Sequence, residues 1–188
     1  VLLRGACTLQ ATDPAPAPVY AAPPAPWVDE IAIGIFAHDR GPTSDEHEEG
    51  IDPNVELLLR SPERPFWRWL GAPRPHLGLT PNFNGDTSAL YAGATYTFDL
   101  SSRLFADGAL GLALHNGPLH TSDRIACEQS SDCGFGSRVL FRYALEVGLR
   151  ISQTSAGSLF YVHLSHQGAL ADENEGIDHI GLRYRIRY

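Results

Sequence analysis

Three side chains near the end of the chain have the types and spacing of a nucleophilic site. His163 and Ser165 are two residues apart in one alternating segment, and Asp178 follows in the next one, after a polar stretch at 169–176. A serine becomes nucleophilic when an imidazole takes its proton and a carboxylate orients that imidazole. This set therefore predicts hydrolysis of an acyl ester, with Ser165 as nucleophile, His163 as base and Asp178 as orienting acid.

The two segments that carry these residues, 157–168 and 177–188, have the period of β-strands. In the second, even positions are Asp178 and then apolar or aromatic residues, whereas odd positions hold His179, a glycine and three arginines. Successive strand side chains point to opposite faces. An apolar face opposite an arginine face favours lipid on one side and a polar barrel interior on the other. Parity puts the three candidate residues on the apolar face, with Ser165 expected near Asp178.

The rest of the chain supplies the other strands of such a barrel. Alternation and turn residues predict an all-β fold, an eight-stranded antiparallel transmembrane β-barrel over 27–188. Its first six strands are expected at 27–39, 53–61, 76–83, 88–100, 103–116 and 136–151. The connection 62–75 carries Trp67 and Trp69, as expected of an aromatic belt at a bilayer interface. The other connections on the side of the N-terminus are short, and two of the four on the opposite side are long, as in outer-membrane barrels.

Residues 1–26 have a different composition. Residues 1–11 have the features of a signal remnant, and the following Pro/Ala-rich stretch predicts an extended periplasmic linker, with a docking segment for a periplasmic protein partner as the alternative. Cys7 raises a lipoprotein alternative, although the residues before it form a poor lipidation box. The formal net charge of −8 argues against a nucleic-acid partner.

A family resemblance rests on the segment HLSHQG at 163–168, followed by NEGID at 174–178 and a strand that ends in an aromatic residue. This pattern resembles the outer-membrane lipid A 3-O-deacylases, the PagL-like (acyloxyacyl hydrolase) family, whose motif is His-x-Ser-Asn-Ala-Gly and then Asn-x-Gly-hydrophobic-acid. The likeness extends upstream to 136–141, 82–93 and 28–39. The chain has His166 where the family has Asn, Gln167 where it has Ala, Asp rather than Glu as the acid, and an intervening loop one residue longer.

The resemblance implies that the protein removes an ester-linked 3-hydroxyacyl chain from the 3-position of lipid A, a lipopolysaccharide component, in the outer leaflet, without a cofactor. The Gly168 amide would form half of an oxyanion hole. The family asparagine replaced by His166 helps to hold the oxyanion, and Asn174 belongs to the same support. Strict alternation turns His166 into the barrel, so catalysis would need a bulge or twist at 166–168, and we expect a slowed enzyme that His166→Asn improves. The alternative is a catalytically impaired or inactive barrel with a structural or partner-binding role.

Three further groups of residues could form a disulfide or bind a cation. Cys127 and Cys133 lie in an exported loop and are expected to form a disulfide. The acidic run 45–49 is expected to be a solvated loop, with a site for divalent cations that bridge lipid phosphates as the alternative. A metal site built on His163, His166 and His179 is opposed by parity, since the first faces lipid and the others face the lumen, and no metal is expected.

Overall fold

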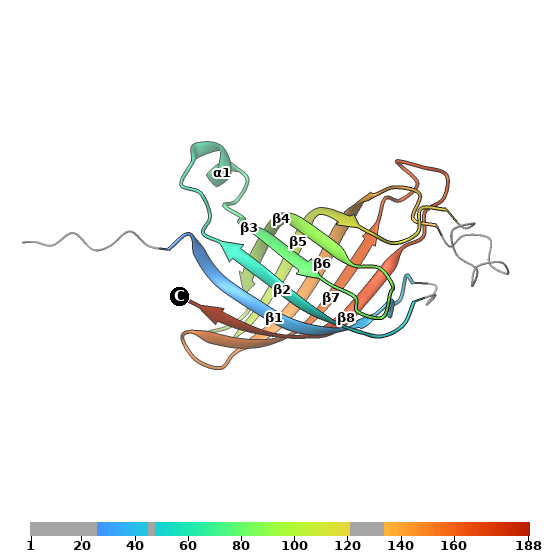
Figure 1. Ribbon diagram of the computed structural model, residues 1–188. Coiled ribbons are helices and arrows are strands. Elements are labelled where there is room, and N and C mark those ends of the chain that lie inside the picture. The colour runs from blue at the N-terminus through green and yellow to red at the C-terminus, as the bar shows by residue number, and fades with distance from the viewer. Residues whose placement is uncertain (1–25, 45–47, 121–133) are drawn as a thin grey trace, which may run out of the picture.

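The computed structural model describes residues 26–44, 48–120 and 134–188, which form a closed antiparallel barrel (Figure 1). Each strand pairs with its neighbours in the chain, and the last strand closes the barrel against the first. The strands are β1 (Val28–His38), β2 (Ile51–Leu59), β3 (Arg74–Thr80), β4 (Ala89–Asp99), β5 (Leu104–His115), β6 (Val139–Arg150), β7 (Ser155–Ser165) and β8 (Ile177–Arg187). The predicted fold class is confirmed. No helix in the described part of the chain is both long and apolar enough to span a bilayer.

Alternation sorts the side chains of every strand into an outer and an inner set. On β1, Ile33 and Ile35 are exposed, whereas Ala32 and Phe36 between them are buried. The same outer set continues around the barrel with leucines, valines and isoleucines from the other strands. A continuous apolar band of this kind is far larger than the patches that soluble monomers expose, and lipid is the solvent that suits it.

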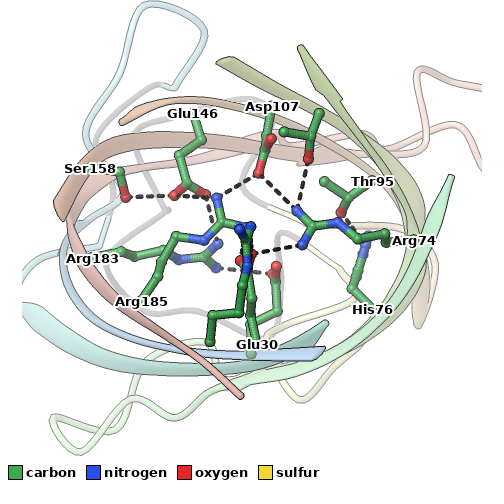
Figure 2. Close-up of polar contacts among 12 residues, drawn as sticks. Glu30, Arg74, His76, Thr95, Asp107, Glu146, Ser158, Arg183 and Arg185 are labelled. Atoms are coloured by element: carbon green, nitrogen blue, oxygen red, sulfur yellow. Dashed lines mark hydrogen bonds and ion pairs between the residues drawn. The ribbon is translucent and has the colours of Figure 1, made fainter. Parts of the chain in front are cut away.

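The inner set contains a network of arginines and carboxylates in the middle of the lumen (Figure 2). Arg183 donates to Glu56 at 3.0 Å and to Glu146 at 3.3 Å, and Arg142 donates to the same Glu56 oxygen at 3.1 Å. Arg185 links Glu146 to further acids on β1 and β5. The guanidinium groups predicted for the interior are thus paired, which offsets the cost of removing them from water.

The two ends of the barrel differ (Figure 1). We call the end that holds Trp27 and Tyr188 the terminal end, and the end with the connections 39–50, 81–88, 116–138 and 166–176 the loop end. The connection at 62–75 lies at the terminal end and contains a helix that the sequence analysis did not predict, α1 (Pro65–Trp69). Proline at its first position has the backbone angle a helix start needs. Trp69 is exposed there, while Trp67 donates to the Pro73 carbonyl at 2.5 Å.

Strand boundaries differ from the predicted ones mainly where side chains bind the backbone. The third strand was expected to reach residue 83 but ends at Thr80. The Asn82 carboxamide oxygen accepts hydrogen bonds from the amides of Asn84 and Asp86, at 2.8 and 2.9 Å, and so replaces strand pairing with a local turn. The signal remnant and linker at 1–25, and the Cys127–Cys133 disulfide, fall outside the described residues.

Candidate active site

The three predicted residues meet at the loop end of the β7–β8 pair. His163 and Asp178 are direct cross-strand partners. The His163 Nδ1 atom donates to Asp178 Oδ1 at 2.8 Å, and Ser165 Oγ lies 2.9 Å from His163 Nε2. The strand register thus places Asp178 opposite His163, and Ser165, which was expected near Asp178, lies two residues further along β7. Serine, imidazole and carboxylate form a continuous hydrogen-bonded row.

Two residues that the sequence analysis did not assign to the site hold the carboxylate. The Thr43 amide donates to Asp178 Oδ2 at 2.8 Å, and the Thr43 hydroxyl lies 2.9 Å from both carboxylate oxygens. The Tyr161 hydroxyl donates to Asp178 Oδ1 at 3.0 Å. Tyr161 shares the parity of His163, which is a signal that sequence could have used. Thr43 comes from the β1–β2 loop, and no pattern linked it to residues about 120 positions later.

The site is more enclosed than an unobstructed lipid-facing surface. Asp178 and Ser165 are 0% and 2% exposed, and only the His163 side chain, at 19%, reaches the surface. The β1–β2 loop covers the acid. At Gly41 an added Cβ would lie 2.3 Å from Asp178 Oδ2, so only glycine permits this approach. The apolar-face prediction gave the correct side of the strand but missed the loop that shields the carboxylate.

His166 lies behind Ser165 with its side chain occupied. Its Nε2 atom donates to the Glu173 carbonyl at 2.9 Å, its Nδ1 atom accepts from the Leu170 amide at 3.4 Å, and its own amide donates to Asn174 Oδ1 at 3.0 Å. It is fully buried. In this geometry the imidazole and Asn174 brace the β7–β8 loop, and both ring nitrogens of His166 have hydrogen-bond partners within that loop.

The chain turns after Ser165, at the residues 166–168 where the sequence analysis expected a bulge or twist. The Ala169 amide donates to the His166 carbonyl at 2.9 Å, and Gln167 and Gly168 have φ angles of 54° and 70°. Within the described chain, the amides of Gln167 and Gly168 donate to no other residue. Two N–H groups on exposed residues therefore lie two and three positions after the serine, and Gly168 adopts a left-handed conformation without a Cβ penalty.

The lumen side of the same end holds a second cluster, which we call the histidine cluster: His38, Glu48, Asp52 and His179. His38 contacts Asp52 through Nδ1 and donates to Glu48 at 2.5 Å through Nε2. Glu48 is buried, so the prediction of a solvated acidic run is wrong at this position; residues 45–47 lie outside the described chain.

Metal-ligand geometry occurs in this cluster and not in the set that the sequence suggested. His163 and His179 lie on opposite faces of the barrel wall, as parity predicted. His38, Asp52 and His179, however, offer ligand atoms that all lie within 4.8 Å of one another. Sequence reasoning missed this grouping because its members come from three strands, and barrel closure between β1 and β8 brings them together.

A model of the family "Lipid A 3-O-deacylase (PagL)" matches residues 63–187, a range that includes His163, Ser165 and Asp178 but not Thr43. The crystal structure of the outer membrane enzyme PagL superposes with a TM-score of 0.59 at 18% identity, covering 85% of this chain and 99% of that one. Neisserial surface protein A (NspA) superposes with a TM-score of 0.51 at 13% identity, covering 85% and 96%. No curated protein sequence matches. At these identities the two structures show a common fold.

Proposed function

This chain belongs to the lipid A 3-O-deacylase (PagL) family, and from that membership we propose that it is a serine esterase that removes the ester-linked 3-hydroxyacyl chain at the 3-position of lipid A. One observation carries the proposal. The His163 ring bridges Ser165 Oγ and the Asp178 carboxylate at 2.9 and 2.8 Å, which is the arrangement a base-activated serine requires.

The first chemical step is attack by Ser165 Oγ on the acyl carbonyl carbon. His163 Nε2 accepts the hydroxyl proton as the new C–O bond forms, and Asp178 stabilises the resulting imidazolium through Nδ1–H. His163 then gives the proton to the departing 3-hydroxyl oxygen of the sugar, which leaves an acyl-serine. Water, deprotonated by the same imidazole, releases the 3-hydroxy fatty acid and restores Ser165.

The negative charge of the tetrahedral intermediate needs hydrogen-bond donors. We assign this role to the backbone amides of Gln167 and Gly168, which are exposed and donate to no other described residue. Backbone donors of this kind typically contribute about 10²–10³ in rate each. The assignment replaces the side chain expected at residue 166, since the His166 ring is bonded to the loop.

The membrane setting follows from the position of the site. The apolar outer band makes this an outer-membrane barrel, and we place the loop end in the outer leaflet and the terminal end toward the periplasm. The ester bond of lipid A lies at the boundary between sugar and acyl chains, and the site likewise lies where the apolar wall meets polar loops. Of the three catalytic residues only His163 reaches the surface, so we expect the ester to approach past its ring, with side chains over Ser165 moving aside.

Mass spectrometry of lipid A after incubation with the purified barrel tests the proposal. The native protein should produce lipid A that is lighter by one 3-hydroxyacyl chain, together with the free acid, and Ser165→Ala should produce neither. Ser158→Ala is the matched control, because Ser158 is a buried serine of the same strand that bonds Glu146 in the lumen. If the native barrel and Ser165→Ala leave lipid A equally intact, the site is inactive and the alternative of a structural or partner-binding barrel takes its place.

A further inference from the structure

We propose that the histidine cluster is a binding site for one divalent transition-metal ion, with Zn²⁺ as the ion that its donors suit. The ligands would be His38, Asp52 and His179, with a water molecule in the fourth position. The three side chains are almost completely buried at the loop end of the lumen. Two imidazoles and a carboxylate with an open position are a common donor set for Zn²⁺.

The positions of the ligand atoms fit one ion. The donor atoms of the three residues lie within 4.8 Å of one another. In a tetrahedral site with bonds of about 2.0–2.2 Å, ligand atoms are roughly 3.4 Å apart, so small rotations of the side chains complete the geometry. His38 and His179 are cross-strand partners on β1 and β8, and their rings cross at 87° with centroids 5.0 Å apart. Two rings in this arrangement can direct one nitrogen each at a shared point.

One nitrogen of the cluster has no hydrogen-bond partner among the described residues, which makes it available to a ligand. His179 Nε2 is buried and forms no hydrogen bond with any described residue; Asp52 Oδ2 lies 3.6 Å away, beyond hydrogen-bond distance. A buried polar atom without a partner is destabilising, because it has lost its hydrogen bonds to water. A metal ion and its water would satisfy the nitrogen.

The surrounding groups fix the ligands in the required form. Glu48 accepts the Nε2–H of His38 at 2.5 Å, so Nδ1, which contacts Asp52 in this structure, is the atom that would bind the metal. Asn82 donates to the second oxygen of Asp52 at 2.9 Å, and Thr87 donates to Glu48 through its amide and its hydroxyl. Metal-binding histidines and carboxylates commonly have such partners, which orient them and raise their basicity.

Charge gives an independent reason for a cation here. In the middle of the lumen arginines face the buried acids, as around Glu56. Around Asp52 the basic groups in contact are His38 and His179. A metal ion binds the neutral form of both imidazoles, and Glu48 and Asp52 then bring two negative charges that one divalent ion would neutralise. Because His179 follows Asp178 directly on β8, the ion would also tie the strand that carries the catalytic acid to β1 and β2.

The test uses Co²⁺ as a visible probe for Zn²⁺. The full-length chain is purified without a polyhistidine tag and folded in detergent. Its cysteines are alkylated and its metals are removed with a chelator, and the protein is then titrated with CoCl₂. We expect one equivalent to bind with the visible absorption of a tetrahedral nitrogen–oxygen site and to be displaced by Zn²⁺. His179→Gln and Asp52→Asn should each lower the affinity by at least 100-fold, and Glu48→Gln by about 10- to 100-fold.

Two controls keep the result decisive. His115→Gln removes another buried histidine of the loop end, one that bonds the Ser137 carbonyl, and should leave Co²⁺ binding unchanged. In an SDS gel, a folded barrel that has not been boiled migrates differently from the boiled protein, and this difference shows that each variant is folded. The proposal is overturned if the native barrel binds no more Co²⁺ than the detergent buffer does without protein. It is also overturned if the folded Asp52→Asn or His179→Gln protein binds Co²⁺ as tightly as the native protein.

Discussion

The middle of the lumen and the loop end use polar side chains for opposite purposes. In the lumen, Arg142 neutralises Glu56, and Arg183 neutralises Glu56 and Glu146 (Figure 2 shows the Arg183 and Arg185 part of this network). In the triad and the histidine cluster at the loop end, the basic groups are imidazoles such as His163 and His38, which contact carboxylates and hydroxyls. Arginine keeps its charge at any physiological pH, whereas a neutral imidazole can take and return a proton or bind a metal. The difference separates the part that stabilises the barrel from the part able to do chemistry.

The sharpest test of this separation is Asp178→Asn. An amide keeps the size of the side chain but cannot stabilise the imidazolium, and it favours the wrong histidine tautomer. We expect a loss of about 10⁴-fold in kcat for lipid A deacylation, with heat-dependent migration in SDS unchanged. The release of 3-hydroxy fatty acid, followed by mass spectrometry, gives the rate. If the variant retains a tenth of the native rate or more, Asp178 does not have the proposed role in the mechanism.

The opposite result is expected for Arg183→Met in the lumen. The substitution leaves Glu56 and Glu146 without one of their guanidinium partners, and removing one member of a buried pair typically costs about 3–5 kcal/mol. The free energy of unfolding, measured by urea titration in detergent, should fall by that amount. Protein that remains folded should deacylate lipid A at nearly the native rate. A large loss of kcat in folded protein would show that the lumen network also controls the site.

Thr43→Val tests how the loop residue supports the acid. The change removes the hydroxyl that lies 2.9 Å from the Asp178 oxygens. It keeps the shape of the side chain and the hydrogen bond of 2.8 Å from the backbone amide to Asp178. A hydrogen bond to a charged group is worth about 1.5–3 kcal/mol, which corresponds to a roughly 10- to 100-fold lower kcat. Thr43→Ser should restore most of the rate, because it returns the hydroxyl. If valine is as active as threonine, the amide alone positions the carboxylate.

The smallest effect is expected for His166→Asn, and its direction decides between two roles. If the family residue acts on the oxyanion here, the rate should rise, as the sequence alone suggested. The structure instead predicts a decrease of less than about tenfold, because asparagine cannot span from the Leu170 amide to the Glu173 carbonyl and the loop loosens. Proteolysis of the 166–174 loop under native conditions should become faster in the same variant. A faster enzyme with an unchanged loop would restore the oxyanion role.

The strands and one face of the site were determined by sequence alone. A period of two fixes which side chains share a face whatever the surroundings, so eight strands, the inward arginines and the common side of His163, Ser165 and Asp178 could all be read from residue types. Element ends were less certain. At Thr80 a side chain competes with strand pairing, and α1 interrupts a connection expected only to carry aromatic residues.

The contacts made across the closed barrel were decided only by the tertiary structure. Thr43 reaches Asp178 because β1 pairs with β8, and the same closure brings His38 and His179 together. These residues are separated by more than a hundred positions, and alternation carries no information about which distant strand is a neighbour or how a loop folds over it. Register and closure supply that information, and they set the pairing of Asp178 with His163, the inward brace made by His166 and the histidine cluster.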